Sequence, residues 1–147
     1  MQVEAEIDGF RDILVKEGVR SYLEIGSKFG GSLWRVASAL PKGSRIVTVD
    51  LPRGTRLWHL SEPALRTTIA QLQAAGYDAH LIWGDSTDRN VIAQVKALGP
   101  YDACFIDANH SWSYLDRDWE HYGKISRIVG FHDIAWRREK DWVGTRI

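Results

Sequence analysis

Acidic residues stand in this chain at five places where a buried strand would end. In sheets of parallel strands, ligands bind just beyond the carboxyl ends of the strands, which lie together along one edge. These residues are therefore the first candidates for binding or catalysis. The five segments are residues 24–32, Asp50, residues 84–86, residues 107–110 and residues 132–133.

Three of these segments have residue types that suit a nucleoside ligand. Gly26 and Gly30 would let the backbone approach a ligand closely and would place a helix N-terminus beside it. Asp50, at the next strand end, fits a bidentate hydrogen bond to ribose hydroxyls. Asp85 is placed to accept a hydrogen bond from an adenine amino group. Alternatively, the glycines form only a structural turn and Asp85 caps a turn.

The elements that must position these residues alternate between helices and strands. Apolar residues at positions 3, 7, 10 and 14 predict a helix over 3–17. Helices between short apolar strands predict βαβ units and a parallel sheet covered on both faces. Further helices are expected over 32–40, 61–75, 88–98 and 112–122, and the second of these would have Ser61 as its cap and Pro63 in its first turn. Strands are expected over 21–25, 46–49, 80–83, 103–106 and from 125 or 127 to 132.

The spacing of the first glycines argues against a dinucleotide. A dinucleotide fingerprint requires Gly-x-Gly-x-x-Gly, whereas this chain has Lys28 at the second glycine position and reads Gly-x-x-x-Gly-Gly. That pattern predicts a wider turn without a tight pyrophosphate seat. It suits a ligand with a zwitterionic tail.

Several segments resemble motifs of class I S-adenosylmethionine-dependent methyltransferases. Residues 22–32 (YLEIGSKFGGS) resemble the first motif, 47–50 (VTVD) the second, and 83–86 (WGDS) the adenine-contacting motif. The runs DACFIDANHSW at 102–112 and GFHDI at 130–134 are similar to the small-molecule O-methyltransferase branch that includes macrocin-type methyltransferases and cephalosporin-hydroxylase-like proteins. The resemblance implies an α/β fold, a Rossmann-like three-layer α/β/α sandwich with a mostly parallel sheet.

The resemblance also implies a cofactor and an activity. The cofactor would be S-adenosyl-L-methionine, and the reaction O-methyl transfer to a small hydroxylated metabolite. Gly26 and Gly30 would pack against the methionine part, with Glu24 near its ammonium group, and Asp50 would hold the ribose. The full set of expected cofactor-binding residues is Glu24, Gly26, Ser27, Gly30, Ser32, Asp50, Leu51, Asp85, Ser86 and Asp107.

A divalent metal is a further expectation from the resemblance. In metal-dependent relatives, an acid after strand four and a pair after strand five bind Mg²⁺ or a similar ion, and those positions match Asp107, His132 and Asp133. Such an ion would lower the pKa of substrate hydroxyls. Asp107 and His110 are the expected catalytic residues, with His110 or Lys28 accepting the proton. Imidazole also suits Mn²⁺ or Fe²⁺. Alternatively, the last pair only caps a strand.

Composition limits the protein class. The 147 residues predict one domain over 1–147, and the 19 basic and 19 acidic residues give no net charge to attract nucleic acid. The single Cys104 excludes an intrachain disulfide, and no apolar run is long enough for a membrane span. We therefore expect a soluble, cytoplasmic protein.

About 14 residues follow the fifth strand, which predicts a sheet shortened to five or six strands. A homo-oligomeric partner would cover its exposed edge.

Two other functions stay open from the sequence. A cofactor-binding module without catalysis would bind S-adenosylmethionine and give no product with any acceptor. A metal-dependent hydroxylase-like enzyme would use the same strand-end ligands, contain iron and show no thermal shift with S-adenosylmethionine.

Overall fold

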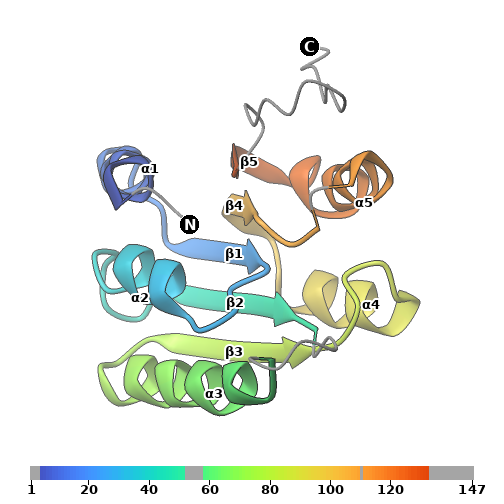
Figure 1. Ribbon diagram of the computed structural model, residues 1–147. Helices are drawn as coiled ribbons and strands as arrows, with labels where there is room; N and C mark the ends of the chain where they lie inside the picture. Colours follow the sequence, from blue (N-terminus) through green and yellow to red (C-terminus); the bar gives the residue numbers. More distant parts are fainter. Residues whose placement is uncertain (1–3, 52–57, 110, 133–147) are drawn as a thin grey trace.

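A computed structural model describes residues 4–51, 58–109 and 111–132 of the chain. Helices and strands alternate along these residues, as the sequence predicts (Figure 1). The strands are β1 (Ser21–Ile25), β2 (Arg45–Asp50), β3 (Asp78–Trp83), β4 (Tyr101–Ile106) and β5 (Ser126–Phe131). The helices are α1 (Glu4–Lys16), α2 (Gly31–Ala37), α3 (Trp58–Ala74), α4 (Arg89–Leu98) and α5 (Trp112–Asp118), and a π-helical turn over Trp119–Gly123 continues α5.

The described strands form one parallel sheet in the order β3-β2-β1-β4-β5. In β1, Tyr22 faces one apolar core together with α1, α2 and α3, whereas Leu23 faces the other core with α4. Figure 1 shows these two sets of helices on opposite sides of the sheet. The expected three-layer α/β/α architecture is therefore confirmed. Both faces of each strand are covered, which explains why the strands are continuous apolar runs.

Three helices differ from the sequence prediction. Helix α2, expected over 32–40, ends at Ala37. Helix α3 begins at Trp58, so the prediction that Ser61 caps it is wrong. Ser61 is instead fully buried within the helix, and Pro63 lies inside it rather than in its first turn. The helix expected over 112–122 is α-helical only to Asp118, and the π-helical turn that follows it ends at Gly123.

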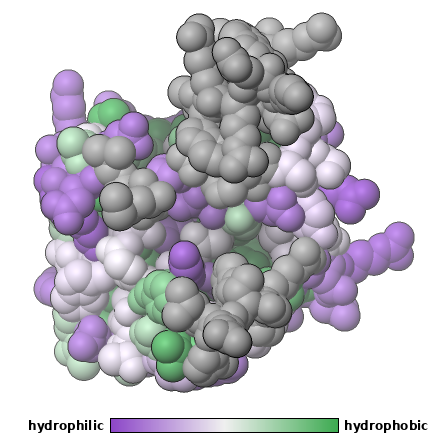
Figure 2. All heavy atoms as spheres, viewed as in Figure 1, coloured by the Kyte–Doolittle hydropathy of each residue, from purple (hydrophilic) through white to green (hydrophobic). Residues whose placement is uncertain are grey.

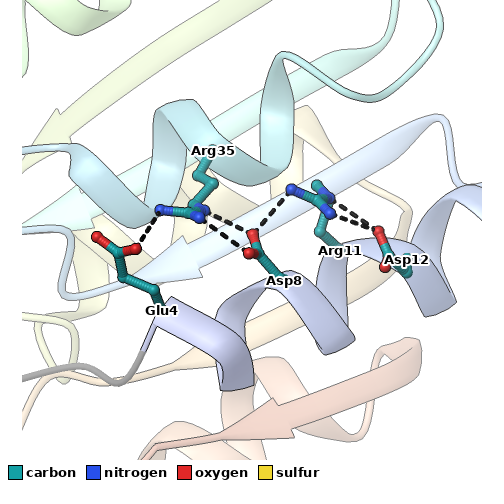
Figure 3. Close-up of polar contacts among 5 residues, drawn as sticks. All are labelled: Glu4, Asp8, Arg11, Asp12 and Arg35. Atoms are coloured by element: carbon teal, nitrogen blue, oxygen red, sulfur yellow. Dashed lines mark hydrogen bonds and ion pairs between the residues drawn. The ribbon is translucent and has the colours of Figure 1, made fainter.

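A network of charged side chains fixes α1 against α2 (Figure 3). Arg35 donates two hydrogen bonds to Asp8, at 2.5 and 2.8 Å, and lies 3.6 Å from Glu4. Arg11 donates to Asp8 at 2.8 Å and to Asp12 at 2.7 Å. Because these side chains are partly exposed, the network orients α1 more than it stabilises the fold.

In the view of Figure 2, the described surface is mostly hydrophilic or neutral, and hydrophobic atoms form small groups. No helix among residues 4–51, 58–109 and 111–132 has both the length and the hydrophobicity needed to cross a bilayer.

Candidate cofactor and metal site at the carboxyl edge of the sheet

Four backbone hydrogen bonds bring the ends of the five strands to adjacent positions on one edge of the sheet. Gly26 donates its N–H to Val49 at 2.8 Å, and Asp107 donates to Ile25 at 2.8 Å. In the same way, Gly84 donates to Asp50 at 2.8 Å, and the His132 N–H donates to the last residue of β4 at 3.2 Å. The loops that begin there are therefore neighbours. The predicted candidates Gly26, Asp50, Asp85 and Asp107 lie along a common edge.

The glycines of the loop between β1 and α2 permit close packing within the protein. Gly26 has φ +90°, and a Cβ atom there would lie 2.5 Å from the Cα of Ala108. Gly30 has φ +83°, and a Cβ there would lie 2.6 Å from the Thr68 hydroxyl on α3. Only glycine combines this backbone conformation with such short approaches. The contacts that require glycine here are therefore contacts with the loop after β4 and with α3.

Glu24 is fully buried beneath this loop. Its carboxylate accepts hydrogen bonds from the hydroxyls of Tyr22 at 2.6 Å, Ser27 at 2.7 Å and Ser32 at 2.7 Å. Burial raises the pKa of Glu24 to about 7, and the three hydroxyl donors offset part of that rise. We predicted that Glu24 lies near a ligand ammonium group. The structure describes it as the acceptor at the centre of a protein network, and its place near a ligand ammonium group stays a prediction.

The ionised form of Glu24 determines the direction of the hydrogen bonds around it. Ser27 uses its hydroxyl hydrogen on Glu24, so Thr48 is the donor in the 2.6 Å contact between the two hydroxyls. Ser32 likewise uses its hydrogen on Glu24. The remaining lone pairs of Ser27 and Ser32 are then free to accept, so ionised Glu24 makes these hydroxyls acceptors.

Asp50 joins the end of β2 to the same loop. It is 6% exposed and accepts hydrogen bonds from the backbone N–H of Leu51 at 2.7 Å and of Lys28. Burial raises the pKa of Asp50, and these backbone donors partly counteract that shift. Lys28 itself has φ +52°, which is uncommon for a residue with a side chain. Asp50 therefore holds the loop in shape and still has lone pairs for another donor.

The turn between β3 and α4 carries Asp85 and Ser86. Asp85 accepts hydrogen bonds from the backbone N–H of Thr87 at 2.8 Å and from its hydroxyl at 2.7 Å, so the turn-capping interpretation describes part of its role. Ser86 is 7% exposed, and its carbonyl accepts a hydrogen bond from the Tyr122 hydroxyl. Hydrogen bonds within the turn and the hydrogen bond from Tyr122 therefore both fix the position of this turn.

The structure describes two of the predicted metal ligands. The Nδ1 atom of His132 lies 3.0 Å from Oδ1 of Asp107, and these side chains are 8% and 16% exposed. Two ligands at about 2.1 Å from one octahedral ion would lie about 3 Å apart, so this spacing fits a shared divalent ion. His110 and Asp133 lie outside the described residues. Within the described part of the chain, no group of three or more candidate ligands occurs.

Sequence analysis did not identify three residues that now belong to the surroundings of the site. Tyr22 and Thr48 complete the Glu24 network, and Asp118 lies fully buried on α5 near the Ser86 turn. Residues two apart in a strand share a face, so the pattern predicts that Tyr22 and Glu24 lie together. No local pattern distinguishes Asp118 from the exposed Asp116.

Comparison with known proteins is consistent with this geometry. Residues 23–134 match a family described as a methyltransferase domain. No curated protein matches the sequence.

Solved structures give the same fold. The O-methyltransferase TomG from Streptomyces achromogenes, determined in complex with SAM, has 21% identity and a TM-score of 0.66, and the match covers 88% of this chain and 56% of that one. An O-methyltransferase from Bacillus cereus in complex with SAH has 20% identity and a TM-score of 0.62, with 82% and 53% covered. This chain therefore spans about half the length of the structures it matches.

Proposed function

Because this chain belongs to the methyltransferase-domain family, we propose that it binds S-adenosyl-L-methionine and transfers the methyl group to an oxygen of a small hydroxylated metabolite. The observation that carries the proposal is the adjacency of the loops after β1, β2 and β4 on one edge of the sheet. Ligands of open parallel sheets bind at that edge.

The three loops offer complementary contacts for the parts of this cofactor. The β1–α2 loop, with Ser27 and Ser32 held as acceptors by Glu24, would receive the methionine ammonium group. Asp50 has the buried carboxylate that ribose hydroxyls require. The turn at Asp85 would face the adenine. The methyl group of the cofactor would then be held in one orientation relative to the acceptor hydroxyl, and such orientation accounts for much of the rate of methyl transfer.

Methyl transfer requires an in-line approach of the acceptor oxygen to the methyl carbon. The carbon–oxygen bond forms as the carbon–sulfur bond breaks, and the sulfur keeps the bonding pair to become a neutral thioether. The hydroxyl proton leaves to a base or to water. A divalent ion at Asp107 and His132 would lower the pKa of the acceptor hydroxyl when bound. Asp107 and His132 would hold the ion, and Asp133 is the third ligand expected from the sequence.

Calorimetry with S-adenosylmethionine and S-adenosylhomocysteine tests the proposal. The unmodified chain is expected to bind both, and Asp50→Ala to weaken both by about tenfold or more, because a buried hydrogen bond to a charged group contributes about 1.5–3 kcal/mol. Asp116→Asn, an exposed change on α5, is expected to leave both affinities unchanged. No binding heat from the unmodified chain would refute the proposal. Equal affinity in Asp50→Ala would refute only the ribose contact.

A binding module without catalysis is a second candidate. The chain covers 56% and 53% of two of the structures it resembles, so the activity of those whole proteins is a proposal for this chain. The two candidates differ in one measurement. The module would bind S-adenosylmethionine and form no S-adenosylhomocysteine with any hydroxylated acceptor, whereas the enzyme would form it with at least one.

A further inference from the structure

Asp118 is a buried carboxylate without a hydrogen-bond partner among the residues that the structure describes. Its side chain is 0% exposed, and neither Oδ1 nor Oδ2 accepts a hydrogen bond from any described residue. Burial raises the pKa of Asp118 to about 6, so the group is mostly ionised near neutral pH. An unsatisfied buried charge is costly, and each such group in a folded protein requires an explanation.

The surroundings of Asp118 identify which element it faces. Tyr122 follows it by one helical turn and donates its hydroxyl hydrogen to the Ser86 carbonyl. Helices α4 and α5 lie on the same side of the sheet (Figure 1). Ser86 lowers the pKa of Asp118 and Asp85 raises it. Burial is the main cause that raises the pKa of Cys104 and of Tyr122, and Asp118 raises both further. Asp118 therefore faces the turn between β3 and α4.

Few donors in this region can satisfy the carboxylate. The Tyr122 hydroxyl is occupied by the Ser86 carbonyl, and Asp85 is itself an acid that accepts from Thr87. The thiol of Cys104 is a weak donor. The hydroxyl of Ser86 is the neighbouring strong donor for which the described residues show no other acceptor, and Ser86 lowers the pKa of Asp118 as a hydrogen-bond donor does.

We propose that Asp118 is a positioning residue that accepts the Ser86 hydroxyl hydrogen and so leaves only Ser86 lone pairs for a bound nucleobase. The side chains of the turn then offer acceptors alone, the Ser86 hydroxyl oxygen and the Asp85 carboxylate. Such a turn selects a base that carries an exocyclic amino group, such as adenine, over a base that carries a carbonyl oxygen at the same position. This inference rests on the proposed function, in which the turn faces the adenine of the cofactor.

Substitution of Asp118 by asparagine reverses the polarity of this arrangement. The asparagine amide can donate to the Ser86 oxygen, which turns the hydroxyl hydrogen toward the ligand. The experiment compares binding of S-adenosylhomocysteine and S-inosylhomocysteine by calorimetry. The unmodified chain is expected to prefer the adenine ligand by about tenfold or more, because a site built for one hydrogen-bonding group rejects the analogue that leaves it unpaired. Asp118→Asn is expected to reduce that preference to about threefold or less, and the matched change Asp116→Asn to leave it unchanged.

Ser86→Ala provides a second test that does not depend on the folding of the Asp118 variant. Loss of the hydroxyl should reduce the preference for the adenine ligand as Asp118→Asn does, and the double variant should show no further loss because both changes act through one contact. A normal preference in either single variant would overturn the inference. Absence of binding by the unmodified chain would instead refute the proposed function, so the two failures are distinguishable.

Discussion

Replacing Glu24 by glutamine should change how the stability of the protein depends on pH. Glutamine keeps the size of the side chain and stays neutral, whereas Glu24 is fully buried among three hydroxyl donors. Burial raises its pKa from 4.5 to about 7. The folded protein therefore holds the Glu24 proton more tightly than the unfolded chain does.

The size of the effect follows from this shift. The folded pKa is the higher one, so the stability that Glu24 contributes is complete below pH 4.5 and is lost as the pH rises through about 7. One pKa unit corresponds to about 1.36 kcal/mol. Between about pH 5 and pH 8 the unmodified protein should lose about 2–3 kcal/mol through this group. Glu24→Gln lacks that loss, although its amide deprives one hydroxyl of an acceptor at every pH.

Urea denaturation followed by tryptophan fluorescence would measure the effect. The quantity to report is the unfolding free energy of Glu24→Gln minus that of the unmodified protein. In this difference the contributions of the histidines and of the other acids to the pH dependence cancel. This difference should shift by about 2–3 kcal/mol in favour of the variant between about pH 5 and pH 8. Glu62→Gln, at a partly exposed side chain on α3, should show no such shift. A difference for Glu24→Gln that stays constant with pH would refute the reasoning.

Three further predictions follow from contacts described above. Gly26→Ala should lower the unfolding free energy by about 2–5 kcal/mol in urea denaturation, because the new Cβ would clash with backbone atoms. Gly18→Ala, at φ +67° with no atom within 4 Å of the new Cβ, should lower it by about 1 kcal/mol, and equal losses would contradict this explanation. Arg35→Met should lower the melting temperature slightly, and the loss should shrink in high salt because the ion pairs of α1 are partly exposed; a loss that salt does not change would exclude an ionic origin. Mn²⁺ binding measured by electron paramagnetic resonance should weaken about tenfold or more in Asp107→Asn and stay unchanged in Asp116→Asn, and equal binding in both would exclude Asp107 as a ligand.

Much of the fold could be predicted because its signals are local. The strand predicted over 21–25 coincides with β1, since turn residues flank a short apolar run. The helix predicted over 3–17 matches α1 closely, and Gly18 has φ +67° just beyond the helix end. Helix α4 begins after Asp88, which caps it with hydrogen bonds to two backbone N–H groups. Each of these features depends on residues close together in the sequence.

The rest of the site depends on contacts between distant segments. Glu24 and Asp118 have the same residue type as exposed acids elsewhere in the chain, and only the packing of the sheet and of α5 makes them fully buried. The start of α3 was mispredicted because Ser61 and Pro63 together look like a helix cap, whereas tertiary burial of Ser61 favours a helix that begins earlier. Sequence patterns therefore locate candidate residues better than they determine the environment of each one.

The place of β1 between β2 and β4 has a consequence for synthesis of the protein. Ser21 and Asp102 exchange hydrogen bonds across β1 and β4 although 81 residues separate them. At about 5–20 residues per second, a ribosome needs about 4–16 s to make that interval. During this time β1 can pair with β2, while its other edge has no strand to join. A chaperone that shields this apolar edge on the nascent chain would raise the yield of folded protein.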